Sequence, residues 1–277
     1  MRFDDRVTGN LDHYAKQAKV VHLEIDPAEI NKNVYADFPV LGNVKETLKV
    51  LLELAKPNSH KEWHNRFKEL YKTEYEKVIS RNLDVNKQDL GMAEVIQEIN
   101  INTEGKAVIV SDVGQHQMAA CRYSDFTQTR SNVTSGGLGT MGFALPAAIG
   151  AKMGAPEREV VAVIGDGGYQ MTIQELGTIF QTKVPVKIVI LNNGFLGMVR
   201  QWQQLFFDRR YASTEMTNPD FVTIAKGYHI EANRVTDRTQ LKKAVKAMID
   251  HDGPYFLEVK VEQEENVCPM VPTGASV

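Results

Sequence analysis

The feature that most constrains the fold is a pair of apolar runs, residues 160–164 and 186–191, with a helical stretch between them. Runs of this kind are typical of strands that are buried on both faces. The intervening segment 172–181 is predicted to be a helix. Strands joined by a helical crossover are parallel neighbours in a sheet. The chain is therefore predicted to have an α/β fold.

Polar residues follow both predicted strands. The first run leads into Gly165-Asp166-Gly167, and 24 residues separate this motif from Asn192-Asn193. The carboxyl ends of parallel strands meet at one edge, where open α/β sheets bind ligands. Asp166 offers a carboxylate oxygen and Asn193 an amide oxygen, and Mg²⁺ prefers oxygen ligands that it shares with a substrate phosphate.

Glycines complete this pattern. Gly167 and Gly168 leave backbone N–H groups uncovered beside a helix start, whose positive end favours phosphate. A lone Gly-Asp-Gly is usually just a turn. Its pairing with Asn-Asn, each after a buried strand, favours a site for Mg²⁺ and a diphosphate.

The wider pattern predicts a doubly wound parallel sheet with helices between most strands. Upstream of it we expect a partial α/β domain over 1–56, with strands at 20–25 and 38–42 and a helix at 44–55. A helical surface linker is predicted over 57–90, and the complete domain over 91–277. Its strands are expected at 107–111, 132–134, 160–164, 187–191, 230–235 and 256–261.

Composition excludes several classes of function. The net charge of −3 indicates no nucleic-acid partner. Cys121 and Cys268 form no metal-type pair and fit a reducing, cytoplasmic setting. The start of the chain lacks the apolar core of a signal peptide. The uncharged stretch 136–151 is too short and too rich in glycine for a membrane span.

The motifs together resemble the thiamine-diphosphate enzymes and, among them, the catalytic large subunits of the acetolactate (acetohydroxyacid) synthase family. The resemblance covers nearly the whole chain. It is carried by the Gly-Asp-Gly and Asn-Asn pair and by the segments 2–10, 114–117, 135–142 and 197–202.

The resemblance implies roles for residues around the diphosphate. Gly114, Gln115 and His116, which open a helix after strand 107–111, would contact the diphosphate, although a lone His there is more often a cap or a surface residue. Gly165, Asp166, Gly167 and Gly168 would surround it. The main-chain carbonyl of Phe195 would join Asp166 and Asn193 as the third metal ligand.

The segment 137–142 also fits the Gly-x-Gly-x-x-Gly dinucleotide fingerprint. That interpretation needs an acidic residue at the end of the next strand to hold a ribose, and Asp166 cannot both do so and bind a metal. In the resembled family, the Gly139 carbonyl would instead accept a hydrogen bond from the cofactor's aminopyrimidine, and Met141 would wedge between its two rings. Gly197 and Met198 would also line the cofactor site, with Met198 and Trp202 over the substrate and Trp202 selecting the second ketoacid. Each methionine alone would be read as core packing.

The N-terminal region would belong to a flavin-binding domain. Segment 2–10 would touch a structural FAD, and Glu24 and Asn43 would contact its adenosine half, although the family often has Asp at the position of Asn43. The residues expected to contact FAD are Arg2, Asp5, Arg6, Glu24 and Asn43.

The implied reaction is the decarboxylative condensation of pyruvate with a second 2-ketoacid, either pyruvate or 2-ketobutyrate, on the way to branched-chain amino acids. We expect a homo-oligomer, with a regulatory small subunit as a possible partner. No segment resembles the pyrimidine domain that supplies the family's ionising glutamate, so we expect a C-terminal half that is inactive alone. Two alternatives stay open: another thiamine-diphosphate enzyme of 2-ketoacids, and a non-catalytic cofactor-binding subunit of a split enzyme.

Overall fold

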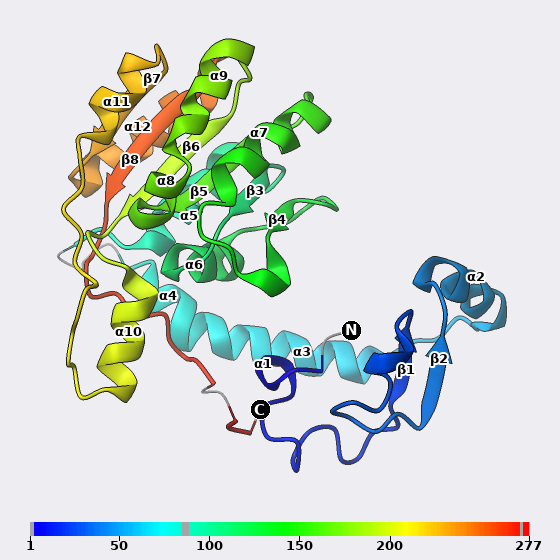
Figure 1. Ribbon diagram of the computed structural model, residues 1–277. Coiled ribbons are helices and arrows are strands. Elements are labelled where there is room, and N and C mark those ends of the chain that lie inside the picture. The colour runs from blue at the N-terminus through cyan, green and yellow to red at the C-terminus, as the bar shows by residue number, and fades with distance from the viewer. Residues whose placement is uncertain (1–2, 85–88, 272–273, 277) are drawn as a thin grey trace. The chain divides into compact units, whose positions relative to one another are not determined.

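The computed structural model describes residues 3–84, 89–271 and 274–276. The chain divides into two compact units (Figure 1). The first contains Met1–Lys72 together with Cys268–Val277, and the second is Thr73–Val267. Each unit is described by itself. Among the described residues, no helix combines the length and the apolar character that crossing a membrane requires.

The second unit is built on a six-stranded sheet in the order β4-β3-β5-β6-β8-β7, and every pairing in it is parallel. This confirms the predicted doubly wound α/β fold. The strands are β3 (Val108–Ser111), β4 (Asn132–Thr134), β5 (Val160–Gly165), β6 (Lys187–Asn192), β7 (Glu231–Val235) and β8 (Tyr255–Lys260).

Helices cover both faces of this sheet (Figure 1). Alternate residues of β5 point to opposite faces, as the pleat of a strand requires. Val161 and Val163 pack with α5 (Met92–Thr103), α6 (Gln115–Tyr123) and α12 (Arg238–Asp250). Val160, Ala162 and Ile164 pack on the other face with α7 (Ala144–Gly154), α8 (Asp166–Met171), α9 (Leu176–Thr182) and α11 (Phe221–Gly227).

The strand order places β3, β5 and β6 side by side in the middle of the sheet. Because all three run in the same direction, their carboxyl ends reach the same edge. Gly165 is in register with Leu191, so Asp166 and Asn192 follow at neighbouring positions. The strand that precedes each predicted motif is therefore where the sequence analysis put it.

The crossover between β5 and β6 contains more separate helical segments than predicted. Instead of one helix over 172–181, the chain forms α8, a 3₁₀ turn η4 (Ile173–Glu175) and α9. The sequence analysis missed α8, because Gly167 and Gly168 in its first turn are poor helix formers and read as a loop.

The first unit contains a parallel pair of strands, β1 (Val21–Glu24) and β2 (Phe38–Leu41). Its other elements are α1 (Asp5–Thr8), the 3₁₀ turn η1 (Pro27–Glu29), α2 (Val44–Leu54) and most of α3 (Lys61–Glu74). The π-helical turn η2 (Tyr75–Ile79) and α4 (Ser80–Asn82) follow α3 along the chain.

The division between the units differs from the expected domain boundaries. It falls within α3, inside the segment 57–90 that was expected to be a linker. Residues 268–277, expected in the second domain, group with the first unit. In this unit the Asn10 N–H donates to the Ala275 carbonyl at 3.0 Å. The two residues are far apart in sequence, so no local sequence pattern predicts this contact.

Candidate functional site

The carboxyl edge of the large sheet contains a cavity of about 150 Å³, and residues that follow three neighbouring strands line it. Residues after β3, β5 and β6 enter its wall together with the loop before α7 and the start of α10 (Gly197–Phe206). Twelve residues expected at the site are among its lining: Gly114, Gln115, His116, Met141, Gly165, Asp166, Gly167, Gly168, Asn193, Phe195, Gly197 and Met198.

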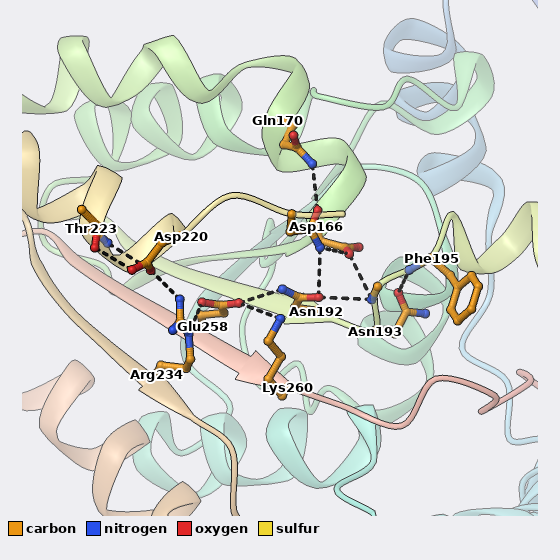
Figure 2. A network of polar contacts seen from close by, with 12 residues as sticks. Asp166, Gln170, Asn192, Asn193, Phe195, Asp220, Thr223, Arg234, Glu258 and Lys260 are labelled. Carbon is orange, nitrogen blue, oxygen red and sulfur yellow. Dashed lines mark hydrogen bonds and ion pairs between the residues drawn. The ribbon is translucent and has the colours of Figure 1, made fainter. Parts of the chain in front are cut away.

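Asp166 begins α8 directly after β5, and its side chain is buried with 1 % of its surface exposed. Its Oδ2 accepts hydrogen bonds from the Gly194 N–H at 3.1 Å and from Asn218 Nδ2 at 2.7 Å (Figure 2). Burial raises the pKa of Asp166 above its ordinary value, and these hydrogen bonds oppose that rise. The carboxylate is thus held in one orientation at the rim of the sheet.

Asn193 follows β6 and is oriented from both sides. Its Oδ1 accepts from the Phe195 N–H at 3.2 Å (Figure 2). Its Nδ2 donates to Gln115 Oε1 at 3.3 Å. Gln115 in turn donates to Gln201 Oε1 at 2.9 Å. The start of α6 is therefore tied to the loop after β6, and the amide of Asn193 is fixed beside the cavity.

His116 contacts a buried carboxylate that the sequence analysis did not single out. His116 Nε2 lies 2.5 Å from Asp112 Oδ1, and Asp112 Oδ2 accepts from the Gly142 N–H at 2.9 Å. Asp112 has no exposed surface. It joins the end of β3 to the loop that carries Met141. Any contact of His116 with a ligand would have to use Nδ1, since Nε2 pairs with Asp112.

Glycines occur where a side chain would collide with these polar groups. A Cβ at Gly168 would lie 2.0 Å from Asp112 Oδ2, and one at Gly197 would lie 2.1 Å from Gln115 Oε1. At Gly165 it would lie 2.7 Å from His116 Nδ1. Gly114 has φ +152°, a conformation that other residues rarely adopt. The close approach of backbone to the cavity therefore depends on these glycines.

Two expected site residues are absent from the lining. Gly139 has φ +59° and lies in the loop before α7, with Val113 as the nearest neighbour of a hypothetical Cβ at 3.6 Å. Trp202 lies on α10, is 40 % exposed and packs against Phe206 with ring centroids 5.1 Å apart. Met198, one helical turn before Trp202, does line the cavity. The roles of Gly139 and Trp202 stay predictions.

The residues expected to contact FAD belong to the first unit. Arg2 lies outside the described residues, and Asp5 and Arg6 are placed only by their backbone in α1. Glu24 ends β1, and its Oε1 accepts from the Ile25 N–H at 2.8 Å. Asn43 caps α2 through a 2.9 Å hydrogen bond from the Lys45 N–H. Because β1 and β2 are parallel, Glu24 at the end of β1 and Asn43 just after β2 lie at the same edge of the strand pair.

The donor set suits Mg²⁺ and a phosphate group. Asp166 supplies a carboxylate, Asn193 an amide oxygen and Phe195 a main-chain carbonyl, and all three residues line the cavity. These are hard oxygen donors of the kind that Mg²⁺ takes while keeping positions open for phosphate. Within the described part of the chain, no three His, Cys, Asp or Glu side chains cluster as metal ligands. The expected set combines three different oxygen types instead.

Two residues important to this geometry escaped the sequence analysis. Asp112 comes directly after a buried strand, the same signal that drew attention to Asp166, and that signal would have found it. Asn218 lies in a loop far along the chain, and nothing in its neighbourhood in sequence points to Asp166.

Comparison with known proteins gives two family matches. Residues 112–259 match the thiamine pyrophosphate enzyme C-terminal TPP binding domain, and residues 1–51 match the thiamine pyrophosphate enzyme central domain. The first match contains Asp112, Asp166, Asn193 and Asn218, so it covers the cavity lining apart from Met92, together with the contacts that orient Asp166 and Asn193.

Individual relatives align along nearly the full chain. The acetolactate synthase isozyme 2 large subunit of Escherichia coli is 41 % identical over 99 % of this chain and 49 % of its own length. The acetolactate synthase large subunit of Corynebacterium glutamicum is 43 % identical over 99 % of this chain and 45 % of its own length. The chloroplastic acetolactate synthase 1 of Oryza sativa subsp. japonica is 40 % identical over 100 % of this chain and 44 % of its own length. The chain spans about half the length of these relatives.

Proposed function

Because this chain belongs to the thiamine pyrophosphate enzymes, we propose that its cavity binds the diphosphate of thiamine pyrophosphate together with one Mg²⁺. The observation that carries this proposal is the convergence of Asp166, Asn193 and Phe195, from two neighbouring strand ends, on one cavity. In this proposal the metal ligands are the Asp166 carboxylate, the Asn193 amide oxygen and the Phe195 carbonyl.

Other residues would position the coenzyme. Gln115 and His116 lie at the start of α6 and would face the diphosphate, while Gly165, Gly167, Gly168 and Gly197 let the backbone approach it. Met141 would support the bend between the two rings, because a flexible thioether fills an irregular gap well. The Gly139 carbonyl would accept a hydrogen bond from the aminopyrimidine.

When bound, thiamine pyrophosphate supplies an electron sink that allows a 2-ketoacid to lose carbon dioxide and the remaining two-carbon unit to add to a second ketoacid. We propose the acetolactate synthase reaction: two pyruvates give acetolactate, and pyruvate with 2-ketobutyrate gives acetohydroxybutyrate. The names of the relatives and their identity of about 40 % support this choice. Met198 would border the substrate, and Trp202 would select the second ketoacid.

The complete enzyme needs more than these residues. We propose that an N-terminal pyrimidine domain, from the half of the relatives' length outside this alignment, supplies an ionising glutamate across a subunit interface. The first unit, whose residues 1–51 match the central domain, would take part in binding a structural FAD through Glu24 and Asn43. A homo-oligomer, a regulatory small subunit and a cytoplasmic location belong to the same proposal.

Titration calorimetry tests the cofactor proposal. Thiamine diphosphate is titrated into the chain with and without Mg²⁺, and the expected result is heat of binding only when the metal is present. Asp166→Ala should abolish that signal because the single carboxylate ligand is lost. Asp250→Ala, an exposed aspartate at the end of α12, is the control and should bind as the unaltered chain does. Metal-independent binding would contradict the proposal.

Product analysis tests the reaction. The chain alone should turn over no pyruvate. With a polypeptide that supplies the pyrimidine domain, paired ketoacids should give acetolactate and acetohydroxybutyrate. Acetaldehyde or acetyl phosphate would instead indicate another thiamine-dependent enzyme, and turnover without the added polypeptide would contradict the proposed need for it.

A further inference from the structure

A loop distant in sequence folds back onto the proposed metal site. The segment after α10 pairs with the loop after β6: the Leu196 N–H donates to the Thr214 carbonyl at 2.8 Å, and the Met216 N–H donates to the Gly194 carbonyl at 2.9 Å. This pairing carries Asn218 to the carboxyl edge of the sheet, beside the start of α8.

Asn218 is held between three polar side chains. Its Nδ2 donates to Asp166 Oδ2 at 2.7 Å and to Asn192 Oδ1 at 3.2 Å, and its Oδ1 accepts from Gln170 Nε2 at 2.9 Å. With donors and acceptor all engaged, the amide has one favourable orientation. The side-chain N–H group of Asn218 is therefore directed at Oδ2 of Asp166.

A buried carboxylate fixes the next link. Glu258, in the middle of β8 and 1 % exposed, accepts from Asn192 Nδ2 at 2.7 Å (Figure 2). Its charge is balanced by Arg234 Nε at 2.7 Å and Lys260 Nζ at 3.2 Å. A buried ion with two such partners and a further hydrogen bond is costly to displace.

These hydrogen bonds and ion pairs form one continuous network, which runs from the ion pairs of β7 and β8 to the end of β5 (Figure 2). Glu258 orients Asn192, Asn192 and Gln170 orient Asn218, and Asn218 with the Gly194 N–H orients Asp166. Partners that orient a metal ligand in this way commonly change metal affinity by about 10- to 100-fold when they are removed.

We infer that Asn218 is a positioning residue for the divalent cation: it fixes Oδ2 of Asp166, so that the carboxylate meets the metal in a single orientation. Glu258 supports this arrangement through Asn192. The inference rests on the proposed metal site, and it adds residues that touch neither the metal nor the diphosphate.

Direct binding of Mn²⁺ tests the inference, because Mn²⁺ replaces Mg²⁺ at oxygen sites and electron paramagnetic resonance distinguishes its free and bound forms. The full chain is titrated with Mn²⁺ in the presence of thiamine diphosphate. Asn218→Ala is expected to weaken Mn²⁺ binding by about 10- to 100-fold and to alter the line shape of the bound ion. Asn218→Leu, similar in size but unable to donate, is expected to weaken it at least as much.

Asn102→Ala is the matched control, since Asn102 is also a half-buried asparagine but lies on α5 and donates to the Glu98 carbonyl. It should leave affinity and line shape unchanged. If the unaltered chain binds Mn²⁺ and both Asn218 variants bind it equally well with the same line shape, the positioning role is wrong while the metal site stands. If the unaltered chain binds no Mn²⁺, the proposed function itself fails.

Discussion

The two units differ most in how far their apolar side chains are buried. In the second unit, both faces of the sheet are covered, and residues such as Ile188, Ile190 and Phe256 have no exposed surface. In the described part of the first unit, Ala36 is the only buried hydrophobic residue. Leu52 and Leu54 on α2 are 76 % and 72 % exposed.

This contrast separates local structure from tertiary stability. The first unit has a parallel strand pair and a capped helix, so its local sequence signals are satisfied. Two strands and their helices, with nearly every apolar side chain at least partly exposed, nonetheless bury too little apolar surface for independent stability. Only the second unit combines those signals with a core, and it is also the unit that holds the cavity.

The largest difference between the units is expected when one apolar side chain is shortened in each of them. Phe256→Ala should destabilise the second unit by about 4 kcal/mol, because a large buried side chain leaves a cavity. Leu52→Ala should change stability by no more than about 0.5 kcal/mol. Hydrogen exchange resolved to peptides measures both, since each unit opens with its own free energy. Similar losses would mean that Leu52 is covered in solution.

The second test is whether the tight packing of the second unit extends to the cavity at the carboxyl edge of its sheet. Gly168→Ala should cost about 3 kcal/mol, because the added Cβ collides with the buried Asp112 carboxylate. Gly150→Ala, on the exposed side of α7 with nothing within 4 Å, should stabilise by about 0.5 to 1 kcal/mol. Thermal denaturation followed by circular dichroism compares them. A tolerated Gly168→Ala would show that Asp112 can move.

A smaller loss than at Phe256 or Gly168 is expected at the N-cap of α2 in the first unit. Asn43→Ala should lower the stability of α2 by about 1 kcal/mol, because the Lys45 N–H loses its acceptor. Asn43→Asp keeps an acceptor and should be neutral. Exchange of the amides in the first turn of α2 reports the change. No difference between the two variants would indicate that capping does not maintain this helix.

Much of the second unit could be predicted from sequence because its strands are continuous apolar runs. The strand predicted at 132–134 is β4 as observed, and the predicted and observed ends of β5 and β6 differ by one residue. Asp166 and Asn193 could be placed together because parallel strands end at the same edge. In these cases a local pattern and a general rule of topology are sufficient.

The orienting contacts could not be predicted in the same way. Glu258 lies in an otherwise apolar strand, and only the fold brings Arg234 and Lys260 to balance its charge. Asn218 reaches Asp166 from 52 residues along the chain. Such pairs depend on tertiary structure, since neither partner's neighbours in sequence indicate the other.

The uniform direction of the strands also has a practical use. The loops that lead into β5 and β6 emerge at the edge away from the cavity, so a fluorescent label at the exposed Glu157 would report on the protein without entering the site. The loop before β8 suits this purpose less well, because the buried Lys187 donates to the His251 and Gly253 carbonyls. Cys121 and Cys268 are exposed and would have to be replaced first, so that the dye reacts at one position.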